Sequence, residues 1–252
     1  MSHDSPLYPV ALVVDGRRCL VVGGGPIATH KTEGLLRCRA HVTVVAPEIT
    51  ERLRLLADEG APSPSDQSAE SAESAASPSA GSGAGAASLV LEERPYRAGE
   101  AADYRLVITA TGNPEVDRAV ADDAEAAGVW VNSADDVDNC TFMLPAVHRD
   151  GDVTVAVSTG GASPALAGWL RDRAADAIGP EAGNLAVLLD EARRNVRAGG
   201  RSTEATDWSA ILSGAFVDLV RSGQVDEARA LLRAAVTEGS GRPSPSARSP
   251  RV

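Results

Sequence analysis

Several features are scarce in this sequence, and the shortages exclude whole classes of protein. The three cysteines, Cys19, Cys38 and Cys140, are odd in number and widely spaced, which is not the pattern of a disulfide framework or a zinc cluster. No continuous apolar run is long enough to span a bilayer. Residues 1–9 carry His and Asp where a signal peptide needs a basic flank and an apolar stretch. We therefore expect a cytoplasmic protein.

Positive charge is the next shortage. The chain has 35 acidic and 24 basic side chains, which gives a formal net charge of -11 and a pI near 4.8. Such a surface excludes long-range attraction to nucleic acid or to an anionic membrane as its main role. Lys31 is the only lysine, and all other basic residues are arginines. Arginine suits bidentate binding of carboxylates, although a G+C-rich coding bias gives the same composition.

Aromatic residues amount to only 3%, but the rest of the composition is that of a globular protein, with 43% hydrophobic and 23% charged residues. The length of 252 residues permits one large domain or two modest ones. Two segments, 61–88 and 239–252, consist almost wholly of Ala, Ser, Gly, Pro and charged residues. They lack the large apolar side chains that anchor a core, so we expect both to be disordered.

Short β-branched runs alternate with helical stretches in the first half of the chain. The expected strands are 18–22, 42–46, 89–91, 106–109 and 129–131, and the expected helices are 28–39, 50–58 and 114–127. Short apolar runs that end at Gly or Pro and alternate with helices are typical of parallel strands covered on both faces. We therefore predict an α/β fold with a Rossmann-like doubly wound parallel sheet.

The pattern changes after residue 138. Two strand-like runs, 142–147 and 153–157, flank the turn sequence 149–152. Helical stretches follow at 163–178, 180–197 and 208–236. The hairpin and the helices are suited to build a partner surface and to close a cleft. The predicted domains are a sheet domain over 1–138 with the insertion 61–88, a hairpin over 139–162, a helical domain over 163–238 and a tail over 239–252.

The strongest motif is Gly23-Gly24-Gly25-Pro26-Ile27-Ala28, which has the spacing G-x-G-x-x-A. It follows a predicted strand and opens a predicted helix, which is the context that dinucleotide binding requires. Gly23 permits a tight turn, Gly25 lets the backbone approach a diphosphate, and Ala28 allows the helix to pack closely on the sheet. Free amides at the helix start favour negative charge. The alternative is a glycine-rich turn with no ligand.

The end of the second predicted strand bears on the choice of cofactor. A dinucleotide site usually has an acidic residue here to bind the adenosine ribose, and Glu48, after Pro47, is the acid available. No arginine lies beside Glu48 to receive a 2′-phosphate, since Arg52 is a turn further on. This favours NAD over NADP.

Loops after the fourth and fifth predicted strands lie at the edge of the sheet where ligands bind. Thr111 and Gly112 belong to a loop of the kind that borders a nicotinamide, and the alternative is an ordinary loop that caps the next helix. Asn132 and Asp135 come at the end of the fifth strand. The adjacent acids at 135 and 136 are also consistent with helix caps or solvated loop residues.

A further glycine loop, 158–164, carries three hydroxyls and precedes a helix. It could cradle a substrate carboxylate or merely cap the helix. The four histidines show no metal-ligand spacing, and Cys19 is expected in the core, so we predict no metal site.

These motifs occur in an order that resembles the precorrin-2 dehydrogenase / sirohydrochlorin ferrochelatase family, the N-terminal part of siroheme synthase. The resemblance runs from Tyr8 to about the helix after Pro180, apart from the insertion. We expect no counterpart of the family's fused methyltransferase domain after Val236. The matching stretches are 19–25, Lys31, 42–47, 109–111, Asn132 with Asp135, Phe142 with 145–146, and 155–164.

The resemblance implies an enzyme that oxidises precorrin-2 to sirohydrochlorin with NAD, and that in some members also inserts ferrous iron to give siroheme. It implies a homodimer built by the hairpin and helices. It also implies that Asp135 acts in both steps, and that Pro26, Ile27, Pro47 and Glu48 contact the cofactor.

An acidic chain repels a tetrapyrrole with many carboxylates, so substrate binding requires a local cluster of donors. The expected donors are Thr159 (in the place of a serine of some family members), Gly160, Gly161, Ser163 and Arg149, with Arg171, Arg193, Arg194 and Arg197 as further candidates.

The alternative function is a regulatory module that senses NAD without catalysis. Such a module would need neither Asp135 nor the loop at 158–164.

Overall fold

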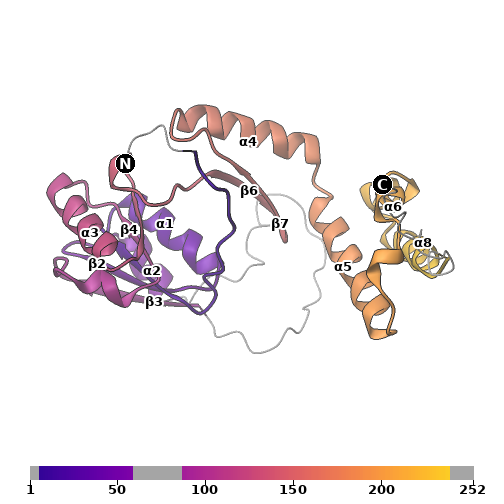
Figure 1. Ribbon diagram of the computed structural model, residues 1–252, viewed down its shortest axis with the longest axis horizontal. Coiled ribbons are helices and arrows are strands. Elements are labelled where there is room, and N and C mark those ends of the chain that lie inside the picture. Colours follow the sequence, from indigo (N-terminus) through magenta and orange to yellow (C-terminus); the bar gives the residue numbers. More distant parts are fainter. Residues whose placement is uncertain (1–5, 59–86, 239–252) are drawn as a thin grey trace, which may run out of the picture. The chain divides into compact units, whose positions relative to one another are not determined.

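The computed structural model describes residues 6–58 and 87–238 (Figure 1). The two segments predicted to be disordered, 61–88 and 239–252, lie outside these ranges except for the last two residues of the first one. Ser88 opens a strand in the structure, so its assignment to the insertion is wrong. Its backbone pairs with His41 of the neighbouring strand, a long-range contact that composition alone does not reveal.

The core of the molecule is a parallel sheet of five strands, which confirms the predicted fold class. The strands are β1 (Arg18–Val22), β2 (His41–Ala46), β3 (Ser88–Glu93), β4 (Leu106–Thr109) and β5 (Trp130–Ser133), in the order β3-β2-β1-β4-β5. Every neighbouring pair is parallel. The central strands are buried on both faces, which is why their sequences are continuous apolar runs and not alternating ones.

Helices cover both faces of the sheet. On one face α1 (Pro26–Arg37) and α2 (Glu51–Asp58) pack over a cluster that includes Val21 and Val44. On the other face α3 (Pro114–Ala126) and the 3-10 helix η2 (Glu100–Asp103) pack over a cluster that includes Leu20. The chain order reverses between β1 and β4, so the loops after these two strands lie side by side. In open α/β sheets this reversal point is where ligands bind.

A short 3-10 helix, η3 (Val137–Asn139), and an antiparallel hairpin of β6 (Ala146–Asp150) and β7 (Val153–Val157) follow the sheet. The prediction of a strand over 142–147 is wrong at its start. Pro145 has no backbone N–H to give to a ladder, and the strand begins directly after it. The predicted turn is also shorter, because the strands continue until Gly151, whose φ is +53°.

The remaining helices are α4 (Pro164–Ile178), α5 (Ala182–Ala198), η4 (Thr203–Ala205), α6 (Trp208–Leu212), α7 (Ala215–Arg221) and α8 (Val225–Glu238). The predicted continuous helix over 208–236 is therefore wrong. Gly214 takes an extended conformation as the N-cap of α7, and Gly223, with φ +77°, follows the C-cap of the same helix. These two breaks let the short helices fold back around the buried Phe216.

The described residues form two compact units. One runs up to Pro145 and also contains Ser158–Pro164, and the other contains Ala146–Val157 and the chain from Ala165 onward. The glycine loop at 158–164 thus belongs to the same unit as the sheet. The predicted domain boundaries at 138/139 and 162/163 stay predictions.

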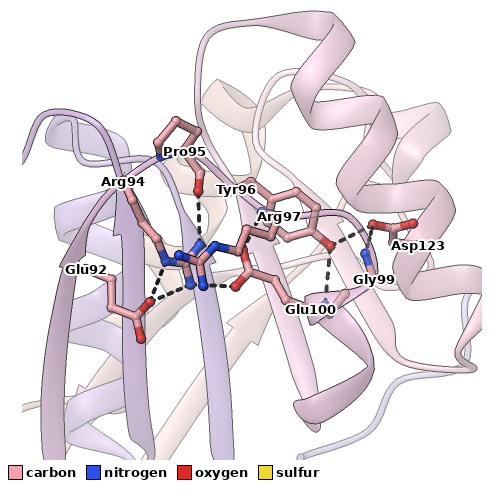
Figure 2. A network of polar contacts seen from close by, with 9 residues as sticks. Glu92, Arg94, Pro95, Tyr96, Arg97, Gly99, Glu100 and Asp123 are labelled. Carbon is pink, nitrogen blue, oxygen red and sulfur yellow. Dashed lines mark hydrogen bonds and ion pairs between the residues drawn. The ribbon is translucent and has the colours of Figure 1, made fainter.

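Figure 2 shows a polar network that joins the end of β3 to η2. The Arg94 guanidinium lies between two carboxylates, since Nε donates to Glu92 Oε2 at 2.7 Å and Nη2 donates to Glu100 Oε2 at 2.6 Å. Burial alone would raise the pKa of Glu100, but the hydrogen bonds from Arg94 and from the Arg97 amide outweigh it and hold that pKa below its usual value.

Asp123 on α3 completes the network. Its Oδ2 accepts hydrogen bonds from the Tyr96 hydroxyl at 3.0 Å and from the Gly99 amide at 2.6 Å (Figure 2). Burial, together with the neighbouring carboxylate, raises the pKa of Tyr96, so the hydroxyl stays protonated as a donor. Asp123 thereby fastens the connection between β3 and β4 to the helix that precedes β5.

We expect Asp123→Ala to lower the free energy of unfolding by about 2 kcal/mol, because two hydrogen bonds to a charged oxygen are lost and their donors are left without a partner. Urea denaturation measures this loss. The matched control is Asp122→Ala, which removes an exposed carboxylate from the same helix turn and should change stability by less than about 0.5 kcal/mol. Equal stability of the two variants would contradict the role given to Asp123.

Candidate functional site

Three loops meet at the glycine turn after β1. Gly23 has a φ of +122°, and a Cβ there would lie 2.3 Å from the carbonyl oxygen of Ala110, in the loop after β4. A Cβ at Gly24 would lie 2.0 Å from the carbonyl oxygen of Glu48, in the loop after β2. Both positions therefore require glycine for contacts within the protein. The role of Gly24 was missed, because sequence reasoning assigned the close approaches only to the outer glycines of the motif.

Gly25 differs from its two neighbours. A Cβ at this position would meet no atom within 4 Å, so the glycine faces open space. Gly25 is the N-cap of α1, with Pro26 at the first helical position and no acidic residue in the first turn. The amides of Ile27 and Ala28 have no carbonyl one turn earlier in the helix. Open space beside unpaired amides fits a nucleotide diphosphate.

The loop after β2 is fastened to the glycine turn. The Thr50 amide donates to the Gly24 carbonyl at 3.0 Å, and the hydroxyls of Thr29 and Thr50 are 2.9 Å apart. This leaves the side chains of Pro47 and Glu48 exposed at the carboxyl end of β2. The position suits contact with the adenosine half of a dinucleotide.

The first arginine after this strand end in the sequence is held by a residue of α1. Arg52 Nε donates to Glu33 Oε1 of α1 at 3.0 Å. A guanidinium held by a carboxylate is less available to a 2′-phosphate, which agrees with the expectation of NAD as cofactor.

The loop after β4 is held by a buried carboxylate that sequence reasoning missed. Asp117 Oδ1 accepts hydrogen bonds from the Thr111 hydroxyl at 2.8 Å, from the Thr111 amide at 3.2 Å and from the Thr109 hydroxyl. Asp117 lies in the first turn of α3 and is only 4% exposed. The three bonds fix Thr111 and Gly112 beside the glycine turn. The available signal was an acid one turn after a Thr-x-Thr sequence, but an acid in the first turn of a helix is common.

All three donors converge on one oxygen, so the acceptor matters more than the charge. We expect Asp117→Ala to release the loop after β4 and to raise the Kd for NAD at least about tenfold, while Asp117→Asn keeps Oδ1 and stays within about threefold of the wild type. Isothermal titration calorimetry with NAD measures both. Equal weakening in the two variants would show that the charge, and not the hydrogen bonds, is what the loop requires.

Asn132 and Cys140 link the end of β5 to the segment that follows it. The Asn132 side-chain amide donates to the Phe142 carbonyl at 3.0 Å, and the Ser133 amide donates to Cys140 Sγ at 3.1 Å. Burial raises the pKa of the Cys140 thiol, which keeps it protonated. The side-chain amide of Asn132 thus holds the segment after β5. The contact of Asn132 with the cofactor stays a prediction.

The two adjacent acids after β5 have different surroundings. Asp136 is the N-cap of η3, where Oδ1 accepts from the Asp138 amide and Oδ2 accepts from the Asn139 side chain, both at 3.0 Å. Asp135 is exposed, and in the described part of the chain its carboxylate has no hydrogen bond or ion pair. Asp136 is therefore a structural cap. Asp135 remains available for chemistry at the same edge of the sheet as the glycine turn.

The loop at 158–164 is closed on itself. The Thr159 hydroxyl accepts from the Ser163 amide and donates to the Ser163 carbonyl, both at 3.1 Å. Gly160 and Gly161 are exposed and have positive φ, at 63° and 88°. Their backbone forms the outer surface of the loop, within the unit that contains the sheet.

The predicted arginines belong to the other unit. Arg149 on β6 donates to the Thr154 hydroxyl at 3.3 Å. Arg171 and Arg194 have carboxylate partners, Asp172 and Asp190. Arg193 lies over the ring of Trp208 at 5.7 Å, and Arg197 is exposed in the last turn of α5.

Among the described residues, no three His, Cys, Asp or Glu side chains come together in a way that could hold a metal ion. None of the helices that the structure describes is long and apolar enough to cross a membrane.

Comparison with known proteins identifies relatives of the chain. The curated relatives include the siroheme synthase of Chromobacterium violaceum, which is 33% identical over 236 residues, covering 92% of this chain and 44% of the relative. The siroheme synthase of Nitrosomonas europaea is 35% identical over 231 residues, with 90% and 43% covered. The chain thus spans less than half the length of these relatives.

A solved structure has the same fold. SirC, precorrin-2 dehydrogenase, matches with a TM-score of 0.65 at 21% identity, covering 92% of this chain and 100% of that protein. A likeness at this identity establishes the architecture of the chain and leaves its activity to be argued from the site.

Two family profiles also match. One, described as putative NAD(P)-binding, covers residues 10–146, and the other, described as the central part of sirohaem biosynthesis proteins, covers residues 150–175. The resemblance to the N-terminal part of siroheme synthase is thereby confirmed, and so is the expected nicotinamide dinucleotide as cofactor. Since the first profile spans more than half of the sequence, the chain belongs to the putative NAD(P)-binding family.

Proposed function

We propose that this chain oxidises precorrin-2 to sirohydrochlorin with NAD as hydride acceptor. One observation carries the proposal: a glycine turn with open space over Gly25 and the exposed, unpaired Asp135 lie at the same edge of one parallel sheet. The names of the relatives, siroheme synthase and precorrin-2 dehydrogenase, support the choice of substrate.

Different residues serve cofactor binding and proton transfer. NAD, when bound, supplies an electrophilic nicotinamide that accepts a hydride. The amides of Ile27 and Ala28 would hold its diphosphate, Pro47 and Glu48 its adenosine half, and Thr111 and Gly112 its nicotinamide half.

The oxidation removes a hydride and a proton from the reduced tetrapyrrole. Asp135 takes that proton, or stabilises the positive charge left as the hydride departs. An exposed carboxylate with no partner is suited to this task because its oxygens are not committed to other donors. The alternative function, an NAD sensor, gives Asp135 no role.

Substrate carboxylates require donors at the mouth of the site. The exposed backbone of Gly160 and Gly161, in the same unit as the sheet, is the donor surface that we assign, while the contacts expected of Thr159, Ser163 and Arg149 stay predictions. Insertion of ferrous iron into the product is a further proposal, in which Asp135 accepts the pyrrole N–H protons and no resident metal site is needed.

The apolar face of α4 supports a homodimer. Leu166, Trp169 and Leu170 lie at helical spacing and are 46%, 55% and 37% exposed. Exposed aromatic and aliphatic residues at such spacing are typical of surfaces that pack against a partner. A cytoplasmic location stays a prediction.

The test is to mix the chain with NAD and precorrin-2 without oxygen and to follow the absorbance of sirohydrochlorin. We expect turnover that depends on NAD. Tight binding of NAD with no turnover would favour the sensor instead. Adding ferrous iron in a parallel reaction separates oxidation from chelation in one preparation.

A further inference from the structure

Lys31, the only lysine of the chain, lies half-buried on α1. In the part of the chain that the structure describes, its ammonium makes no hydrogen bond and no ion pair. Other charged residues of α1 are paired: Glu33 binds Arg52 at 3.0 Å and Arg37 lies 3.9 Å from Glu33. The lack of a partner is therefore particular to Lys31 and is not a general feature of the helix surface.

Its place on the helix directs Lys31 toward the ligand edge of the sheet. Thr29 and Glu33 lie on the flank of α1 that faces α2, as their contacts with Thr50 and Arg52 show. Lys31 lies on the other flank, in the neighbourhood of the Cys140 side chain. Side chains of a helix lean toward its N-terminus, which here is the glycine turn.

The same position lies next to the loop that carries Asp135. Cys140 Sγ accepts from the amide of Ser133, the last residue of β5, at 3.1 Å, and it lies 3.4 Å from the Asp136 carbonyl. A charge that is close to this thiol is therefore close to the carboxyl end of β5. All of these residues belong to the unit that contains the sheet.

A half-buried cation without a counter-charge costs free energy, since water is removed from it and nothing replaces that water. Burial lowers the pKa of Lys31 for this reason. Two arginines at this edge do have carboxylate partners, because Arg52 faces Glu33 and Arg118 lies 3.9 Å from Asp136. A ligand bound at this edge can bring the counter-charge that the described residues do not supply.

We propose that Lys31 is the counter-ion of an oxyanion on a ligand bound between the glycine turn and the loop after β5. The oxyanion is either the diphosphate of the dinucleotide or a carboxylate of the tetrapyrrole, and the second source rests on the proposed function. An ammonium donates charge-assisted hydrogen bonds to either group. Lys31 then positions the ligand relative to Asp135.

The test compares Lys31→Met, Lys31→Arg and the control Arg37→Met, which removes a cation from the last turn of the same helix. Affinities for NAD and for sirohydrochlorin are measured separately by direct binding. We expect Lys31→Met to weaken one of the two affinities about 10- to 100-fold and Lys31→Arg to recover most of the lost affinity. Arg37→Met should leave both affinities unchanged. The ligand that is affected identifies the source of the oxyanion.

Two further readouts separate this role from a structural one. Urea denaturation of the apo protein should show Lys31→Met at least as stable as the wild type, because an unpaired buried charge is removed. Amine-specific acylation modifies one lysine side chain in the whole protein, so mass spectrometry of the peptide with Lys31 reports its accessibility directly. We expect the ligand whose affinity falls in Lys31→Met to slow acylation.

The proposal is overturned if Lys31→Met binds both ligands as the wild type does and neither ligand slows acylation. It is also overturned if Lys31→Met is less stable than the wild type and its loss of affinity is no larger than its loss of folded protein explains. These binding measurements do not require turnover. A wild-type protein that fails to oxidise precorrin-2 would refute the proposed function and would leave the role of Lys31 to be decided by the affinities alone.

Discussion

Asp135→Asn is expected to lower kcat for precorrin-2 oxidation about 100- to 10,000-fold, which is the usual contribution of a general base. The amide has nearly the shape of the carboxylate but cannot accept the proton. Because Asp135 has no hydrogen bond or ion pair in the described part of the chain, the variant should keep the stability and the NAD affinity of the wild type. Steady-state kinetics at saturating NAD measure the effect.

Asp138→Asn is the matched control for Asp135. Asp138 is another exposed carboxylate of the same loop, three residues further along, and the structure uses its backbone amide in the turn. Its replacement should leave kcat within about twofold. Undiminished turnover in Asp135→Asn would remove the proposed base, and an equal loss in both variants would point to the net charge of the loop.

Gly25→Val is expected to weaken NAD binding at least about 100-fold, or about 2.7 kcal/mol, while the change of N-cap residue lowers the free energy of unfolding by only about 1 kcal/mol. The backbone at Gly25 has φ -80° and ψ -175°, an extended conformation that valine adopts readily. A Cβ there meets nothing within the protein, so the added methyl groups extend only into the space assigned to the diphosphate. Calorimetric titration with NAD and thermal unfolding measure the two quantities.

The control for this change is Gly34→Val, also on α1 and also facing open space, but far from the helix N-terminus. It should bind NAD as the wild type does. If Gly25→Val bound NAD normally, the diphosphate would have to lie elsewhere and the assignment of the cradle would be wrong.

The sheet and its ligand edge could be predicted because their signals are local. β1 and β4 have the predicted bounds, since each is a continuous apolar run that a glycine turn or a polar loop ends. The glycine turn could be predicted as well, because a G-x-G-x-x-A sequence between a strand and a helix is typical of dinucleotide binding.

What sequence reasoning missed depends on contacts between distant residues. The acceptor role of Asp117 requires β4 and the start of α3 to be in place, and the burial of Lys31 requires the segment around Cys140 to fold back along β5. The breaks at Gly214 and Gly223 escaped prediction because a single glycine is tolerated inside a helical pattern. Their effect appears only when the short helices pack around Phe216.

The most direct test of the account is to count the two products of a single anaerobic reaction of the chain with NAD and precorrin-2. Hydride transfer to a dinucleotide held at the glycine turn predicts one NADH for each sirohydrochlorin formed, and formation of both products at least about 100-fold more slowly in Asp135→Asn. Sirohydrochlorin that appears without NADH, or NADH and sirohydrochlorin at wild-type rates in Asp135→Asn, would contradict it.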